Sequence, residues 1–430
     1  MLKLSPATVV ETRHAHERLE SPGGGRPEPA GEQRLVVELG RGDGPGERRE
    51  AIADVALVGL AQVGDEVIVN TQALDLGLGS GGFDIVHANL TRGLQGTGAL
   101  APPAPSAPWQ GDTLFGDPGT DLGANAMKLN YTSLQHAIEP VEHEQGNRVA
   151  LPVGRPAGVL ALHGQLAGVA WAFAQGAPGA RLGYVQTEGG ALPGGRSRSV
   201  RMLRERGLLA GHLTAGAAFG GEREAITTAG ALHHGLQVLG WDAAVCGPGP
   251  GIVGSGSSLG HGGMVALDSA HVALALGCPT LLAVRMSSGD PRSRHRGISH
   301  HSLTVLDLLL EPVTVALPAG VRSPVGADLR AGLQAVFGGA MPGRPAVQPA
   351  VQPAAPAVEV DRPPVERPAR IARHDWRRAR IDLPAYAASG LPAETMGRGV
   401  IADPLFFGAA LAAGSVLAQL ALESSSGQDE

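Results

Sequence analysis

The fold class follows from Thr280-Leu-Leu-Ala-Val284 and the polar stretch directly after it, Arg285-Met-Ser-Ser-Gly-Asp-Pro-Arg-Ser-Arg-His-Arg-Gly-Ile-Ser-His-His301. The apolar run is typical of a buried strand, and residues 302–310, which come next, have the apolar spacing of a helix. In an open parallel sheet, a loop between a strand and a helix lies at the carboxyl edge, where ligands bind. This loop carries four arginines, three histidines and Asp290, so the sequence predicts a small-molecule site there.

The same alternation of strand-like and helix-like runs is found on both sides of this stretch, from residue 149 onward. The other predicted strands are 158–162, 181–185, 212–215, 243–246 and 313–317. Helical segments are predicted near 165–174, 199–207, 224–239 and 263–276. This pattern predicts an α/β fold with a mostly parallel, doubly wound sheet and helices on both faces.

By composition, the chain divides into four parts. Residues 1–147 hold short extended runs between Gly, Pro and Asp turns, which predict a small β-rich, barrel-like domain. Residues 148–339 are the predicted α/β domain, and residues 340–367 are a Pro/Ala-rich stretch that we interpret as a disordered linker. Residues 368–430 are expected to form a strand and a helix that pack back on the α/β domain.

The overall composition limits the partners of the protein. Of 430 residues, 43% are apolar, 17% are charged and 3% are aromatic, and the net charge is -6. Nucleic-acid binding needs basic patches or stacking aromatics, so no nucleic-acid partner is expected. No membrane partner is expected either, because residues 405–422, the longest apolar stretch, are Ala/Gly-rich and contain Gln419.

Lysine and cysteine content narrows the chemistry and the location. Lys occurs only at Lys3 and Lys128, which excludes a Schiff-base lysine or a phosphate-loop lysine beyond residue 128. Cys246 and Cys278 form no Cys-x-x-Cys pair and fit a reducing compartment. Because no secretory signal is present either, we expect a cytoplasmic protein.

A glycine-rich stretch follows the predicted strand 243–246. Gly249-Pro-Gly-Ile-Val-Gly254 matches G-x-G-x-x-G, but no helix begins inside the motif, which disfavours a nicotinamide cofactor. The glycines predict either a loop that cradles an anion or a flexible crossover. A G-x-S-x-G match at 256–260 is rejected, because Ser258 lies too far from the strand to form a nucleophile elbow.

Three histidines flank a predicted helix start, for which Ser299 is a good N-cap. The positive end of the helix dipole opposes a charged imidazole, so His295, His300 and His301 are expected to stay neutral. Neutral imidazoles can bind a metal, donate to an anion or act as bases. The alternative interpretation is a solvent-exposed helix entry without a ligand.

Polar residues also follow other predicted strands, namely His163 in His-Gly-Gln, Glu188 in Thr-Glu-Gly-Gly and Glu222 in Phe-Gly-Gly-Glu. In a parallel sheet these loops would share one edge with residues 285–301. Carboxylates and neutral histidines could hold a divalent metal of unknown identity, or arginines and glycines could hold an anion while histidines transfer protons. No other cofactor is indicated, and both chemistries stay open.

The sequence therefore assigns two groups of site residues. The expected catalytic residues are His163, Glu188, Glu222, Asp290, His300 and His301. The expected ligand-binding residues are Arg285, Arg294, His295, Arg296, Gly249, Gly251 and Gly254.

Several motifs give the chain a family resemblance. They include Leu162-His-Gly-Gln-Leu166, Gly183-Tyr-Val-Gln-Thr-Glu-Gly-Gly-Ala-Leu-Pro193 and Arg294-His-Arg-Gly-Ile-Ser-His-His301. With these motifs, residues 9–408 apart from the linker resemble a bacterial family known as domain of unknown function 3866. The chain departs from the pattern of similar sequences at Gly164, where they have Ser, and His261 lies outside that pattern. The resemblance implies no activity.

The leading hypothesis is a cytoplasmic α/β enzyme that acts on a small anionic metabolite, for example a phosphorylated one, at the carboxyl edge of the sheet. One alternative is a non-catalytic ligand-binding or sensing protein whose β-rich domain grips a partner. Another is a structural protein, in which the polar side chains named above would not cluster.

Overall fold

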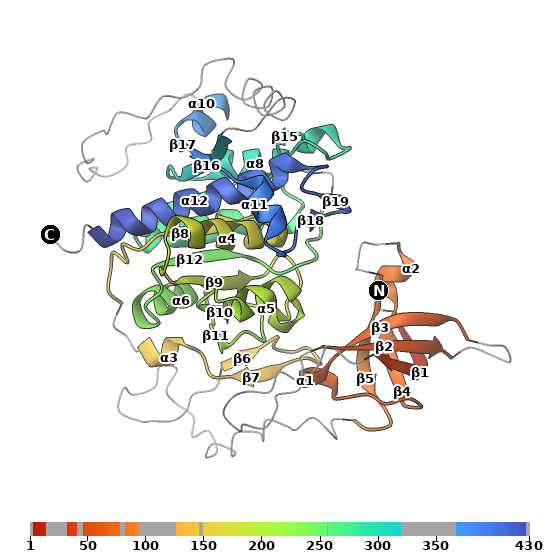
Figure 1. The fold of residues 1–430 in the computed structure, drawn as a ribbon. Coiled ribbons are helices and arrows are strands. Elements are labelled where there is room, and N and C mark those ends of the chain that lie inside the picture. Colours follow the sequence, from red (N-terminus) through yellow and green to blue (C-terminus); the bar gives the residue numbers. More distant parts are fainter. Residues whose placement is uncertain are drawn as a thin grey trace, which may run out of the picture. The chain divides into compact units, whose positions relative to one another are not determined.

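The computed structural model describes residues 3–13, 32–40, 46–77, 82–93, 126–145, 149–255, 257–319 and 367–426. The chain folds into two compact units. The first comprises Met1–Asn125 and Leu129–His136, and the second comprises Ala126–Lys128 and Ala137–Glu430 (Figure 1). The predicted linker, residues 340–367, lies outside the described residues except for its last residue.

The first unit contains a small closed barrel of five strands in the order β1-β2-β3-β5-β4. Neighbouring strands are antiparallel except for β3 and β5, which are parallel. This is the topology of OB-type barrels, which serve many unrelated functions, so it assigns no activity by itself. The strands are β1 Leu4–Arg13, β2 Glu32–Leu39, β3 Arg48–Asp54, β4 Glu66–Asn70 and β5 Asp84–Asn89.

Alternation of buried and exposed residues explains the barrel. In β1, every second residue from Ser5 to Val9 points inward and is buried, while the residues between them face outward. Short helices α1 Val55–Val58 and α2 Gln72–Asp75 connect strands of the barrel. The predicted β-rich, barrel-like fold of the amino-terminal part is therefore confirmed.

The second unit contains an eight-stranded sheet in the order β11-β10-β9-β12-β8-β13-β16-β17, in which all pairs are parallel. The strands are β8 Ala157–Leu160, β9 Leu182–Thr187, β10 Gly211–Thr214, β11 Arg223–Glu224, β12 Ala243–Pro248, β13 Thr280–Ala283, β16 Thr314–Ala319 and β17 Asp375–Arg380. Every residue of β8, β9, β10, β12 and β13 is buried, as expected for strands covered on both faces. The prediction of a parallel sheet is confirmed.

Helices cover both faces of this sheet (Figure 1). One core contains residues of α4 Leu166–Gly176, α5 Arg198–Glu205, α11 Leu383–Ala388 and most of the buried face of α12 Pro404–Ser426. The opposite cores contain residues of α6 Thr228–His233, α7 Val265–Ala275, α8 His300–Leu308 and α10 Arg367–Ala372. The shorter elements β6 Ala126–Lys128, β7 His136–Ile138 and α3 Glu142–Gln145 precede the sheet in the chain.

The carboxyl-terminal segment completes this unit. Strand β17 pairs with β16, and α12 packs against α4. A Cβ at Gly414 would collide with the backbone of α4 at Val169, so glycine permits this close helix contact. Helix α12 is long and apolar enough to cross a membrane, but 83% of its most apolar window is buried inside the unit, where it acts as a core helix.

The strand order defines a switch point at β8. From β8 the chain passes over to β9 and continues to β11 on one side, then returns to β12 beside β8 and crosses to β13 on its other side. Where the loops after neighbouring strands run in opposite directions, a crevice opens at the carboxyl ends of those strands. The loops after β12 and β13 therefore flank the end of β8.

Candidate functional site

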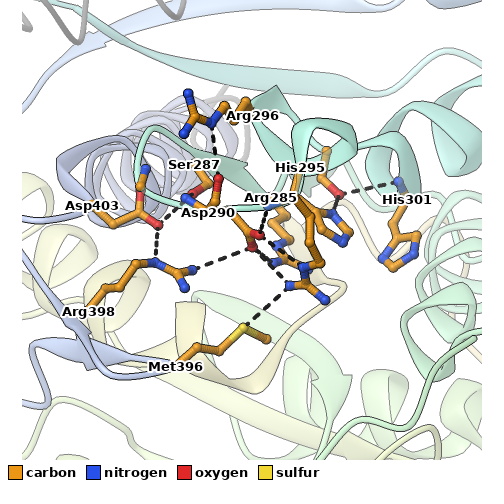
Figure 2. Close-up of polar contacts among 12 residues, drawn as sticks. Arg285, Ser287, Asp290, His295, Arg296, His301, Met396, Arg398 and Asp403 are labelled. Carbon is orange, nitrogen blue, oxygen red and sulfur yellow. Dashed lines mark hydrogen bonds and ion pairs between the residues drawn. The ribbon is translucent and has the colours of Figure 1, made fainter. Parts of the chain in front are cut away.

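The loop after β13 is a closed hairpin. Strand β14 Met286–Ser287 pairs antiparallel with β15 Gly297–Ile298, and the 3-10 turn Ser293–His295 lies between them. At the base of the hairpin, the backbone N–H of Ser299 donates to the carbonyl of Arg285 at 2.9 Å. The hairpin thus brings the start of α8 back to the end of β13 (Figure 2).

Four histidine rings converge at this point. The ring centroids lie 3.4 Å apart for His261 and His301, 4.0 Å for His300 and His301, 5.0 Å for His295 and His301, and 5.1 Å for His295 and His300. Possible metal-binding atoms of His295, His300 and His301 lie within 4.8 Å of one another. We call these four residues the histidine cluster. Its member His261 comes from the loop after β12 and was not assigned from the sequence.

The surroundings keep three rings of the cluster, His261, His295 and His301, neutral. Burial lowers the pKa of His261 to about 4, and the charges of His300 and Arg285 add to this effect. Burial likewise lowers the pKa values of His295 and His301 to about 3, with further contributions from nearby positive groups. At neutral pH these rings offer lone pairs and N–H donors rather than positive charges.

Next to the cluster, Asp290 anchors the hairpin through arginines. Its fully buried carboxylate accepts hydrogen bonds at 2.9 Å from Arg285 Nη2 and from both Nε and Nη2 of Arg292, and Arg398 Nη2 lies 3.5 Å away. Burial would raise the pKa of Asp290, but the hydrogen bonds and charge of Arg292 and the charge of Arg285 hold it well below its usual range. Asp290 is therefore a charged ion-pair partner and a weak base.

A second buried carboxylate, Asp403, ties the carboxyl-terminal segment to the same hairpin. It accepts hydrogen bonds from Ser287 Oγ at 2.6 Å, Ser288 N at 2.8 Å and Gly289 N at 3.2 Å. Arg398 Nε donates to it at 3.2 Å (Figure 2). The residue before α12 thus holds the hairpin in place from a distant part of the chain.

The three arginines expected to bind an anion differ in their surroundings. Arg285 is buried and donates through Nη2 to Asp290, while its Nε has no hydrogen-bond partner among the described residues. Arg294 and Arg296 are exposed, and Arg296 Nε donates to the Asp290 carbonyl at 3.1 Å. Only Arg285 thus lies buried beside the cluster.

His163 belongs to a separate buried network. Its Nε2 lies 2.7 Å from Ser197 Oγ, and its Nδ1 lies 3.2 Å from the carbonyl of Pro248 and 3.3 Å from the Tyr184 hydroxyl. The ring of His212 stacks on Tyr184 with centroids 5.3 Å apart. Burial lowers the pKa of His163 to about 4. The described contacts of His163 link the turn after β8 to the start of α5 and to strands β9 and β12, and they do not include the histidine cluster.

None of the described contacts of the two predicted glutamates, Glu188 and Glu222, is with the histidine cluster. Glu188 follows β9 and is exposed. Glu222 forms an ion pair with Arg204 at 2.5 Å and accepts from the backbone N–H of His212 at 3.2 Å. Because the two-residue strand β11 runs parallel beside β10, Glu222 lies next to the second residue of β10 rather than at its carboxyl end.

The glycine loop makes close contacts with protein backbone. A Cβ at Gly249 would collide with the carbonyl of Ala191, and Gly251 has a φ of 73°, which favours glycine. Gly254 forms an isolated bridge with His261, and Gly262, directly after His261, lies against the backbone of Gly189. These contacts position His261 just before the 3-10 turn Gly262–Met264, which leads into α7.

Comparison with known proteins gives a family. The model of a family described as a protein of unknown function (DUF3866) matches residues 50–414. The chain belongs to this family. No curated protein and no solved structure matches it.

The family assignment confirms the resemblance seen in the sequence, with a match that begins inside β3 and ends inside α12. The matched span contains the histidine cluster together with Asp290 and Asp403. Sequence reasoning missed His261, Arg292 and Asp403 as members of this region. Arg292 lies in the quoted loop, so its position gave a signal, whereas the convergence of His261 depends on strand order.

Proposed function

We propose that this protein is an enzyme that acts on a small anionic metabolite at the carboxyl edge of the sheet, beside β8. The supporting observation is the histidine cluster, whose members follow β12 and β13, the strands on either side of β8, with neighbouring ring centroids 3.4–5.1 Å apart. Neutral imidazoles at a switch point of a parallel sheet are suited to donating and accepting protons on a bound molecule.

The charge of the neighbouring hairpin supports an anionic ligand. Arg285, Arg292 and Arg398 surround two carboxylates, Asp290 and Asp403, which leaves a formal excess of positive charge. Exposed Arg294 and Arg296 on the same hairpin add to it. Positive side chains raise the local concentration of anions and can bind phosphate or carboxylate groups directly.

The test is a ligand screen followed by product detection. Thermal melting of the purified protein would be measured with inorganic phosphate, nucleotides, sugar phosphates and small dicarboxylates, with His301→Ala as the site variant and His143→Ala as the matched control. His143 is exposed on α3, so its loss should not alter the response. We expect stabilisation by one anion class in wild type and control only, and conversion of that ligand on incubation.

Two outcomes would contradict the proposal. If no anion stabilises the wild-type protein, the anionic substrate is excluded. If the ligand binds but is recovered unchanged after prolonged incubation, the ligand-binding or sensing hypothesis replaces the enzyme.

We also infer a cytoplasmic location. Cys246 and Cys278 are buried, free thiols, which supports a reducing compartment. Recovery of the native protein in a periplasmic or membrane fraction would contradict this inference.

A further inference from the structure

We propose that His295, His300 and His301 form a binding site for one divalent transition-metal ion. This inference deepens the proposed function, on which its catalytic meaning rests. Possible ligand atoms of the three side chains lie within 4.8 Å of one another. Nitrogens that share a tetrahedral zinc ion at 2.0–2.1 Å are roughly 3.4 Å apart, so small side-chain rotations bring the three into bonding range.

The hydrogen bonds around the cluster prepare its ligand atoms. Ser299 Oγ lies 2.8 Å from His295 Nδ1 and accepts from the backbone N–H of His301 at 3.4 Å (Figure 2). When Nδ1 donates to this hydroxyl, Nε2 of His295 carries the lone pair. A partner that fixes the second nitrogen in this way is usual for metal-binding histidines.

Unpaired nitrogens give an independent reason for an ion. Nε2 of His301 and Nε2 of His261 are buried atoms without a hydrogen-bond partner in the described part of the chain. Buried polar atoms are normally paired, and exceptions often mark a missing ion or water. His261 stacks on the face of His301, with 21° between the ring planes, and supports that ring.

The ligand type selects the metal. Three imidazoles without a carboxylate favour zinc, copper, nickel or iron over magnesium or calcium, which prefer oxygen. Three protein ligands also leave a coordination position open, as in catalytic zinc sites. When bound, such an ion would supply Lewis acidity at that open position.

Electrostatics near the site has opposing contributions. The positive charge of Arg285 disfavours a cation, and the Asp290 carboxylate that accepts from its guanidinium at 2.9 Å offsets part of that charge, because Asp290 is shared with Arg292 and Arg398. An ion in this place would increase the attraction for an anionic ligand, in agreement with the proposed substrate class.

The experiment is a cobalt titration of untagged, chelator-treated protein, read by visible absorption and confirmed by elemental analysis. We expect one Co²⁺ per chain, displaced by Zn²⁺. The variants His295→Gln, His300→Gln and His301→Gln should each weaken binding at least about tenfold. His143→Ala, the exposed control, should bind as wild type.

The site is refuted if wild-type protein binds neither Co²⁺ nor Zn²⁺ at one ion per chain. It is also refuted if the three histidine variants fold and bind the metal like wild type. Should a variant fail to fold, ¹⁵N spectra of the histidine rings in wild type give the answer. Zn²⁺ must then shift a small subset of the 15 histidines, and uniform or absent shifts refute the site.

This outcome is separable from that of the proposed function, because metal binding is measured without substrate. A bound ion without turnover of any anion refutes the enzyme and keeps the site. Turnover of an anion by protein that binds neither Co²⁺ nor Zn²⁺ refutes the site and keeps the enzyme.

Discussion

Two helices of the α/β unit begin at a serine that lies within hydrogen-bond distance of a buried histidine. Ser197 caps α5 and lies 2.7 Å from His163, while Ser299 caps α8 and lies 2.8 Å from His295. In both cases burial lowers the histidine pKa far below its usual value. Locally, the two pairs are nearly the same motif.

The difference lies in the second nitrogen of each ring. His163 Nδ1 meets the carbonyl of Pro248 at 3.2 Å, so the protein itself satisfies that ring. The ring of His295 faces His300 and His301 instead. Burial and neutrality therefore do not mark a binding site by themselves, and the metal site is proposed because three imidazoles lie within 4.8 Å of one another.

The largest effect is expected from removing the charge that anchors the hairpin beside the histidine cluster. Asp290→Asn leaves buried Arg285 without its carboxylate partner, which should lower the free energy of unfolding by about 3–5 kcal/mol. Denaturant unfolding of variant and wild type measures this difference. A loss below about 1 kcal/mol would show that the hairpin does not depend on the ion pair.

The His163 pair should give a pH-dependent stability. Its folded pKa of about 4 lies below the unfolded value of 6.5, so protons bind preferentially to the unfolded chain. The stabilisation is complete above pH 6.5 and is lost as the pH falls through about 4, by about 3 kcal/mol. Unfolding free energies from pH 7 to pH 4 test this, with His163→Gln expected to reduce the slope, because the other buried histidines still contribute. An unchanged slope in that variant would contradict it.

The two serines provide a matched comparison. Ser197→Ala and Ser299→Ala should each cost about 1 kcal/mol of stability, because each removes a helix cap and a hydrogen bond to histidine. Only Ser299→Ala should weaken cobalt binding, by about tenfold, since it releases the ring of His295. Equal cobalt affinities in the two variants would show that the Ser299–His295 pair contributes no more to metal binding than the Ser197–His163 pair.

The smallest effect is expected at Glu222, which the sequence had assigned to the site. Its ion pair with Arg204 is partly exposed, with 47% of the glutamate side chain accessible, so Glu222→Gln should change the unfolding free energy by less than about 1 kcal/mol. The same denaturant measurement applies. A loss of several kcal/mol would mean that this carboxylate has a buried role.

The sequence was informative about the sheet because burial on both faces leaves continuous apolar runs. The predicted strand at 280–284 corresponds to β13, and that at 243–246 lies within β12. Ser299 was recognisable as a helix cap, because serine is a preferred N-cap residue and the helical run of α8 begins directly after it. Parallel pairing then placed the loop after β13 at the carboxyl edge.

The remaining parts of the site depend on contacts that are distant in sequence. His261 joins the cluster because β12 and β13 lie on either side of β8, and this order has no local signature. Asp403 accepts a hydrogen bond from Ser287, which lies 116 residues earlier, although the sequence around Asp403 indicates only the start of a helix. The position of Glu222 beside the second residue of β10 could not be predicted, because β11, with two residues, is too short to produce a recognisable pattern.

The most direct measurement is anomalous diffraction from crystals of the protein grown with Zn²⁺ and recorded at the zinc absorption edge. One strong peak is expected at roughly 2.0–2.1 Å from ring nitrogens of His295, His300 and His301. Clear electron density for the histidine cluster with no anomalous peak beside it would contradict the proposed metal site. A single peak elsewhere on the chain would contradict it as well.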